Sequence, residues 1–327
     1  MSESASPILK VEGLKKYFPV RRGFFQRVGD HVRAVDGVNL DIQPNQTLGL
    51  VGESGCGKST VARLILRLLT PDEGRICFDN QQIAGLNERQ FKPLRKKIQM
   101  IFQDPYSSLN PRMTVAQSIA DGVRISGITD VGAQQRRIAE LLEMVGMPKA
   151  SAERYPHEFS GGQRQRVGIA RALSVSPRLI LCDEPISALD VSIQAQIINL
   201  LKDLQTELGL SYLFISHDLN VVSYICDRVK VMFRGKIVES APTELLFDDP
   251  RHPYTLKLLA AVPDIASGDW TPQLDAEGKA KNTASACGFA DQCSAHVPEC
   301  DTGIDEMIEV EPGHFVRCRL AMEKRTR

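Results

Sequence analysis

The segment that most constrains this chain is Gly52-Glu-Ser-Gly-Cys-Gly-Lys-Ser-Thr60, a glycine-rich stretch between two apolar segments. Residues 47–51 form an apolar run typical of a buried strand, and 61–69 have the apolar spacing of a helix. Glycine permits a tight turn in which successive N–H groups point at an anion, and the start of a helix adds partial positive charge there. The order of strand, loop and helix therefore predicts a phosphate-binding loop and a nucleoside triphosphate ligand.

Two side chains of this loop have predicted roles of their own. Lys58 is expected to contact the β- and γ-phosphates, and the Ser59 hydroxyl is expected to ligate Mg²⁺. The other positions are expected to bind phosphate mainly through the backbone, and they are Gly52, Glu53, Ser54, Gly55, Cys56, Gly57 and Thr60.

Charge and hydropathy exclude several classes of function. The 40 basic and 40 acidic residues cancel, which argues against a dominant nucleic-acid surface. No apolar run approaches the roughly 18 residues that a membrane span needs. Residues 1–7 lack the basic and apolar regions of a signal peptide. We therefore expect any contact with a membrane to be made through a partner protein.

Strand and helix patterns alternate along most of the chain. Strands are expected at 8–18, 32–42, 75–79, 98–102, 179–182 and 212–215, with a hairpin at 229–238. Helices are expected within 61–69, 115–147, 164–173 and 191–208. This alternation predicts an α/β fold with a largely parallel sheet.

Polar residues with chemical potential follow several of these strands. Asp183 ends an apolar strand, where a buried carboxylate is costly unless it serves a cation, so Mg²⁺ is its expected partner. Glu184 is expected to polarise the water that attacks the γ-phosphate. Gln103 and His217 also follow strands, but each has an ordinary alternative, as a loop amide and as a capping or core histidine.

The order and spacing of these residues resemble the ATP-binding subunits of ABC transporters over residues 8–240. The most specific segment is Phe159-Ser-Gly-Gly-Gln163, which is close to the Leu-Ser-Gly-Gly-Gln signature of that family, with Phe159 in place of the leading leucine. The resemblance implies a RecA-like P-loop NTPase fold, an ABC nucleotide-binding domain. It has an α/β core at 8–103 and 177–246, a helical subdomain at 104–176, and a small Cys-rich C-terminal extension at 247–327.

The same resemblance implies roles for individual residues. Glu184, His217 and Gln103 would be catalytic, Asp183 would be the Mg²⁺-associated aspartate together with Ser59 and Gln103, and Phe18 would stack on adenine, with Tyr17 as the alternative. The signature of one subunit would close over ATP held by another. The residues implied in that contact are Ser160, Gly161, Gly162 and Gln163, with Asp190 in the adjoining D-loop. The chain is therefore expected to be an active Mg²⁺-dependent ATPase.

Three further segments look like those of dipeptide and oligopeptide importers. They are Gln103-Asp-Pro-Tyr-Ser-Ser-Leu-Asn-Pro-Arg112, Arg154-Tyr-Pro-His-Glu158 and Arg251-His-Pro-Tyr-Thr-Leu-Lys-Leu-Leu259. The match implies the second of two ATPase subunits, peripheral on the cytoplasmic face of the inner (plasma) membrane. Its implied partners are another ATP-binding subunit, two permeases that the segment 104–118 would contact, and indirectly a periplasmic or extracellular substrate-binding protein. Import of nickel or glutathione, and a soluble ABC ATPase acting on ribosomes or DNA, remain alternatives.

The last four cysteines form a cluster of their own. Cys287, Cys293, Cys300 and Cys318 fall within 32 residues, after a polar linker at 264–286. A chain in a reducing cytosol is more apt to use such thiols for a metal than for disulfides. The gaps are longer than in most zinc knuckles, whereas iron–sulfur clusters take four thiolates at more varied spacings. The resemblance to the importer subfamily, whose members share a cysteine cluster in this tail, implies a [4Fe–4S] cluster as the first expectation. Zinc is the second expectation, and four unrelated thiols are the third.

Overall fold

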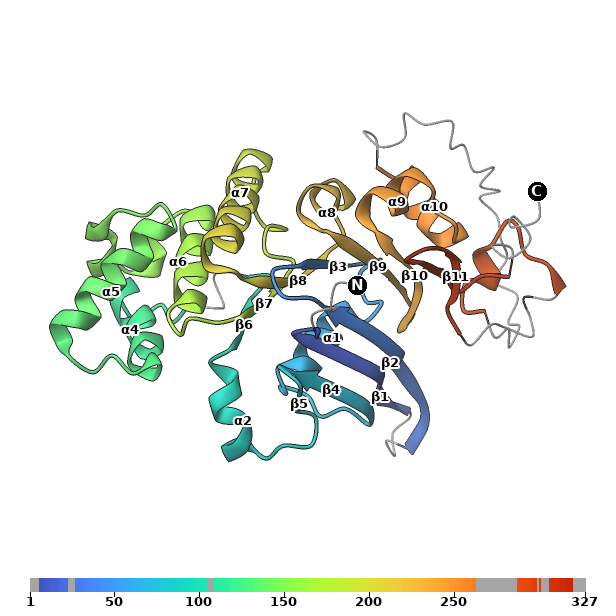
Figure 1. Cartoon of the computed structure of the whole chain (residues 1–327), viewed down its shortest axis with the longest axis horizontal. Helices are drawn as coiled ribbons and strands as arrows, with labels where there is room; N and C mark the ends of the chain where they lie inside the picture. The colour runs from blue at the N-terminus through green and yellow to red at the C-terminus, as the bar shows by residue number, and fades with distance from the viewer. Residues whose placement is uncertain are drawn as a thin grey trace. The chain divides into compact units, whose positions relative to one another are not determined.

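The computed structural model describes residues 6–22, 27–104, 109–262, 287–298, 300 and 306–319 (Figure 1). Most of the basic segment 21–27, residues 105–108 of the segment 104–118, and the linker 264–286 lie outside these residues. The chain divides into two compact units, and each is built from three segments. The first unit contains Met1–Leu9, Asp41–Thr47 and Cys77–Ile215, and the second contains Lys10–Leu40, Leu48–Ile76 and Ser216–Arg327.

Three parallel strands form the centre of the first unit. They lie in the order β8 (Ser211–Ser216), β7 (Leu179–Asp183) and β6 (Ile98–Ile101), with Ile101 opposite Cys182 and Asp183 opposite Ile215. Every residue of β7 and β8 is buried, as expected for parallel strands that are covered on both faces. The carboxyl ends of these strands lead into Gln103, Asp183 and Glu184, because parallel strands end at one edge of a sheet.

Helices make up most of the rest of the first unit, and α4, α5 and α6 pack against one another (Figure 1). The long predicted pattern at 115–147 is interrupted because Gly127 adopts a left-handed φ of 112° and ends α4. Asp130 then begins the next helix by accepting a hydrogen bond from Ala133 N–H. The bounds are α2 Glu88–Arg95, α4 Val115–Ser126, α5 Val131–Met144, η1 Lys149–Glu153, η2 Pro156–Glu158, α6 Gly161–Leu173 and α7 Val191–Leu208.

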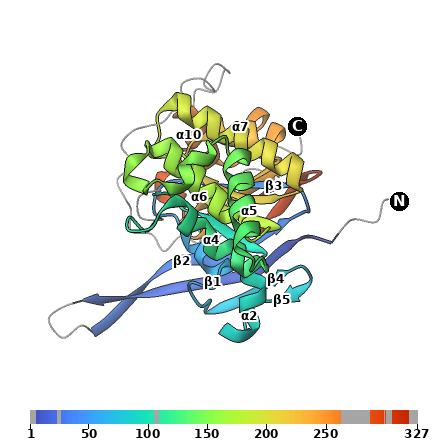
Figure 2. The same cartoon turned by 90° about the vertical axis from the view of Figure 1, so that its left-hand side faces the viewer.

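The second unit contains two groups of strands. In the first group β2 (Arg27–Ile42), β1 (Leu9–Arg22) and β4 (Glu73–Phe78) are neighbours in that order, and Figure 2 shows β1 and β2 as a long ribbon. The last two residues of β4, Cys77 and Phe78, belong to the first unit, where they pair antiparallel with β5 (Gln81–Gln82).

The second group has the order β11 (Ile308–Glu311), β12 (His314–Val316), β10 (Lys236–Pro242), β9 (Arg228–Phe233) and β3 (Thr47–Val51). Only β3 and β9 are parallel here, and the other pairs are antiparallel. The antiparallel pair β9–β10 is the hairpin predicted at 229–238. The hairpin β11–β12, which belongs to the tail, was not predicted, and it extends the sheet through a pairing of Val316 with Glu239.

Five helices complete the described part of the second unit. They are α1 Lys58–Ile65, α8 Leu219–Ile225, α9 Thr243–Asp248, α10 Pro253–Ala260 and η3 Ala290–Gln292. Among the described residues of both units, no helix combines the length and the apolar character needed to cross a membrane.

Candidate functional site

The glycine-rich loop between β3 and α1 is a tight turn that only glycine fits at two positions. Gly57 has a φ of 112°, and a Cβ there would lie 2.0 Å from Ala34 O. A Cβ on Gly52 would lie 2.1 Å from Met232 O. A side chain at either position would collide with fixed backbone, so the loop holds its N–H groups in a narrow, defined cradle. This shape fits the predicted binding of phosphate.

Lys58 is the first residue of α1, and its side chain lies back along the loop. It is only 4% exposed, and Nζ donates to Gly52 O at 2.7 Å and Glu53 O at 2.9 Å. It also approaches Cys56 Sγ at 3.8 Å. Burial raises the pKa of the Cys56 thiol, so Cys56 is a neutral neighbour of the ammonium. The two loop carbonyls therefore hold the ammonium within the loop.

The two candidate adenine-stacking residues differ in their contacts. Both the side chain and the backbone of Tyr17 make hydrogen bonds within the protein. Its hydroxyl donates to Asp36 Oδ1 at 2.6 Å, and its N–H donates to Asp72 Oδ2 at 2.6 Å. Phe18 is 36% exposed, with Lys16 Nζ 5.7 Å from its ring centroid. The exposed ring fits the preference for Phe18 over Tyr17 as a stacking surface.

In the first unit, Gln103 and Glu184 contact each other directly. Gln103 Nε2 donates to Glu184 Oε2 at 2.9 Å. Glu184 has a left-handed φ of 47°, which is unusual outside glycine, and its N–H donates to Ile215 O at 2.9 Å. Asp183 precedes it at the end of β7 and is 5% exposed. The end of β7 therefore has two consecutive acidic residues, of which Asp183 is buried and Glu184 is hydrogen-bonded to Gln103.

The signature segment begins α6, and its serine is the N-cap. Ser160 N–H donates to Gln163 Oε1 at 3.1 Å, and Gln163 N–H donates to Ser160 Oγ at 3.4 Å. Phe159 is 4% exposed and lies under the guanidinium of Arg154, 4.4 Å from ring centroid to Cζ. Phe159 thus fills the apolar position of the signature, and the N-terminus of α6 follows directly after it.

The remaining predicted residues lie at helix starts. Asp190 is the N-cap of α7, and its carbonyl accepts from Ile193 N–H and Gln194 N–H, both at 2.9 Å. His217 is exposed and directly precedes Asp218, the N-cap of α8.

The structure places the predicted residues in two sets. Gln103, Asp183, Glu184, Asp190 and the signature belong to the first unit, and Phe18, the phosphate loop and His217 belong to the second. The side chains proposed for Mg²⁺ are Ser59, Gln103 and Asp183, which supply a hydroxyl, an amide carbonyl and a carboxylate. All three are oxygen donors of the kind that Mg²⁺ prefers, so the donor set fits in kind.

Tyr254 contacts the phosphate loop and was not predicted from the sequence. Its hydroxyl accepts from Glu53 N–H at 2.9 Å. The only signal in the sequence was its place in the importer-like segment at 251–259, which carries no information about the loop.

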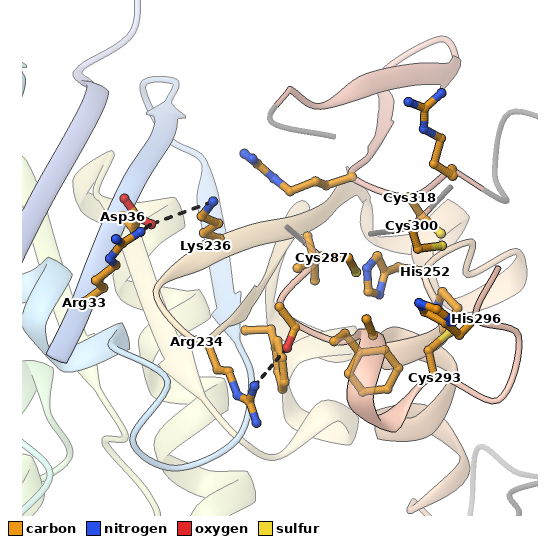
Figure 3. Close-up of a pocket in the computed structure, with 18 residues that line it drawn as sticks. Arg33, Asp36, Arg234, Lys236, His252, Cys287, Cys293, His296, Cys300 and Cys318 are labelled. Carbon is orange, nitrogen blue, oxygen red and sulfur yellow. Dashed lines mark hydrogen bonds and ion pairs between the residues drawn. The ribbon is translucent and has the colours of Figure 1, made fainter. Parts of the chain in front are cut away.

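All four tail cysteines line one cavity of about 210 Å³, together with His252 and His296 (Figure 3). None of the four is in a disulfide. Burial raises the pKa of the Cys287 and Cys293 thiols above the usual value. Within the part of the tail that the structure describes, however, no three His, Cys, Asp or Glu side chains are grouped so as to hold a metal ion. The predicted iron–sulfur or zinc site is thus matched in residue type and not in geometry.

Comparison with known protein families gives two matches. Residues 35–187 match the family described as ABC transporter. Residues 238–300 match the oligopeptide/dipeptide transporter, C-terminal region.

Individual relatives match over nearly the whole chain. The oligopeptide transport ATP-binding protein AppF of Bacillus subtilis is 48% identical over 96% of this chain and 97% of its own length. A putative peptide import ATP-binding protein of Brucella ovis is 46% identical over 96% of this chain and 98% of its own length. The glutathione import ATP-binding protein GsiA of Salmonella paratyphi A is 55% identical over 79% of this chain, which corresponds to 41% of GsiA.

Solved structures agree with these matches. A dimeric ATP-binding cassette in a post-hydrolysis state with ADP and phosphate has a TM-score of 0.64, at 30% identity, covering 72% of this chain and 98% of that one. CbiO1 of Clostridium perfringens, part of an ABC transporter complex, has a TM-score of 0.64 at 28% identity, covering 80% of this chain and 97% of that one.

Proposed function

Since this chain belongs to the ABC transporter ATP-binding proteins, in the oligopeptide transport branch, we propose that it powers the import of di- or oligopeptides through partner permeases. It is an ATPase whose hydrolysis is coupled to transport. The main structural support for the proposed ATP hydrolysis is the hydrogen bond from Gln103 Nε2 to Glu184 Oε2. This bond orients the carboxylate that is best suited to act as a general base.

The proposed roles follow from the chemistry of each group. Lys58 and the loop N–H groups bind the phosphates, and Phe18 stacks on the base. Glu184 accepts the proton of the attacking water, and His217 contacts the γ-phosphate. Mg²⁺, when bound by Ser59, Asp183 and Gln103, would neutralise charge on the phosphates. Ser160, Gly161, Gly162, Gln163 and Asp190 bind ATP held by a second subunit.

Transport in reconstituted vesicles tests the proposal. The chain would be assembled with its permeases and a second ATP-binding subunit, and uptake of labelled dipeptide, oligopeptide, Ni²⁺ and glutathione would be measured with and without ATP. We expect ATP-dependent uptake of a peptide and its loss with Lys58→Ala, which removes the phosphate-binding ammonium. Uptake of glutathione alone would favour the cargo named for GsiA. Absence of all uptake, with ATP hydrolysis intact, would refute the importer.

The proposed partners follow from the same family. They are a second ATP-binding subunit, two transmembrane permeases and, indirectly, a substrate-binding protein. We propose that the chain is peripheral on the cytoplasmic face of the inner membrane. Co-purification with permeases from detergent-solubilised membranes would support this, and recovery without them would count against it.

The tail cysteines carry a separate proposal, a [4Fe–4S] cluster, with zinc as the second choice. Support comes from the four thiols that line one cavity. The lack of a grouped ligand set among the described residues counts against it. No step of ATP hydrolysis depends on this metal. Iron, sulfide and zinc analysis of anaerobically purified protein tests it: about four irons per chain support the cluster. Metal-free protein would refute both metals.

A further inference from the structure

The tail segment at 287–293 packs against residues that hold the phosphate loop. Phe289 is 3% exposed, and its ring centroid lies 5.6 Å from that of Tyr254 and 5.4 Å from that of Phe233. Phe233 and Tyr254 are themselves 4.5 Å apart. These three rings form one apolar cluster, so the position of Tyr254 depends on the packing of the tail.

Tyr254 in turn fixes the first residue after Gly52. Its hydroxyl accepts from Glu53 N–H at 2.9 Å, while Glu53 O accepts from Lys58 Nζ at 2.9 Å and from Cys56 N–H at 3.3 Å. Burial raises the pKa of Tyr254, so the hydroxyl keeps its proton at all ordinary pH values. A shift of Tyr254 would therefore move Glu53, whose carbonyl accepts a hydrogen bond from the phosphate-binding Lys58.

Lys257 makes a second connection between the same two regions. Its Nζ donates to Gln292 Oε1 at 3.0 Å, next to Cys293, and it lies 3.8 Å from Glu53 Oε1. The ammonium thus bridges the tail and the loop residue that Tyr254 also holds.

The turn between β9 and β10 makes a third connection. Arg234 Nη1 donates to Gly288 O at 3.0 Å, marked by a dashed line in Figure 3. The adjacent Gly235 N–H donates to Cys56 O at 2.9 Å. Each connection therefore joins residues 287–293 to a different atom of the phosphate loop.

We propose that Tyr254 and Lys257 are positioning residues of the phosphate loop, and that they couple the affinity for nucleotide to the packing of the tail at 287–293. The proposal rests on the assignment of this loop as the ATP site. Coupling of this kind is reciprocal: if the tail affects ATP binding, ATP binding must stabilise the tail by the same factor.

The first test removes single contacts in the full-length chain. Tyr254→Phe keeps the ring and deletes the hydroxyl, and we expect Mg-ATP affinity to fall about two- to tenfold, the range for one lost hydrogen bond. Tyr212→Phe is the matched control, because Tyr212 is also buried and its hydroxyl donates to Leu201 O at 3.0 Å. We expect this control to lower the unfolding temperature while leaving nucleotide affinity unchanged. Equal affinity in Tyr254→Phe and wild type would overturn the positioning role.

The second test reads the tail itself. Hydrogen exchange of peptides covering 287–293 should slow when Mg-ADP is added to the wild-type chain. The slowing should shrink in Lys257→Gln and in Tyr254→Phe, and it should persist in Lys149→Gln, whose ion pair with Glu143 is exposed. Exchange unaffected by nucleotide in a wild-type chain that binds it would overturn the coupling. Equal nucleotide binding by wild type and Lys58→Ala would instead refute the ATP site.

Discussion

At the scale of single residues, Glu184 is held in an unusual backbone conformation by two hydrogen bonds. A left-handed φ of 47° costs a non-glycine residue roughly 1–3 kcal/mol and persists only where the surroundings fix it. Here the N–H donates to Ile215 O, and the carboxylate accepts from Gln103. Backbone strain together with a fixed carboxylate is typical of a residue at a functional site whose orientation matters.

Glu184→Gln tests the role of this carboxylate as a base. Glutamine has the same length and can still accept from Gln103, but its amide cannot take a proton from water. We expect turnover to fall by roughly two to four decades, with ATP affinity unchanged, in single-turnover hydrolysis and equilibrium binding. Glu140→Gln is the control, since that glutamate pairs with Arg137 on the exposed face of α5. Near-normal turnover in Glu184→Gln would remove Glu184 from catalysis.

At the scale of elements, the sequence predicts well those strands and helices that depend on the pattern of neighbouring residues. The run Leu179-Ile-Leu-Cys182 is apolar at every position, because β7 is covered on both faces, and the polar residues after it mark the end of the strand. Tyr254 could not be found in this way, because its partner Glu53 lies 201 positions away. The pairing of β12 with β10 could not be predicted for the same reason, since it joins Val316 to Glu239 across the linker.

The packing of α6 on α7 explains the signature glycine in a way that the phosphate chemistry alone does not. A Cβ on Gly162 would lie 2.4 Å from Ile193 Cγ2. We therefore expect Gly162→Ala to destabilise the chain by about 1–3 kcal/mol in urea unfolding, through overpacking. Gly168→Ala in the same helix meets nothing within 4 Å and should instead stabilise by about 0.5–1 kcal/mol. Adding Ile193→Ala should recover most of the loss, and failure of that recovery would contradict the packing explanation.

The start of α10 gives a pH dependence. Burial lowers the pKa of His252 to about 4, with Glu239 opposing the shift and Arg317 adding to it. In the unfolded chain the pKa is about 6.5. Between these two pKa values the unfolded state binds more protons than the folded state. The contribution of His252 to the free energy of unfolding should therefore be complete above about pH 6.5. It should fall by up to about 3 kcal/mol as the pH drops toward 4.

His252→Asn separates this effect from general acid denaturation. The asparagine side chain can still accept from Tyr254 N–H, as His252 Nδ1 does at 3.0 Å, so the helix cap is kept. Urea unfolding from pH 4 to 8 should show a shallower slope for His252→Asn below pH 6.5. A slope equal to that of wild type would contradict the assignment.

At the scale of the whole molecule, the chain contains one phosphate loop and one signature. Lys58 lies at the start of α1 and donates to Gly52 O of the loop, and the signature begins α6 with Ser160 as its cap. In the proposed function both helix starts would bind phosphate, and each chain supplies one of each. A shared ATP site in a dimer would use both, with the signature of one subunit facing the phosphate loop of the other.

Ser160→Arg in one subunit tests this arrangement. Arginine would remove the cap oxygen and place bulk and charge where the γ-phosphate is expected, so the damage should appear at the site whose phosphate loop belongs to the partner. The variant would be assembled with an unaltered second ATP-binding subunit and the permeases, and each chain would be scored separately for photolabelling by azido-ATP after vanadate trapping. We expect the partner's loop to lose trapped nucleotide while Lys58 of the altered chain keeps it, with Ser126→Arg, an exposed-helix change near the end of α4, leaving both unaffected. Loss confined to the altered chain's own loop would mean that the two motifs act within one subunit.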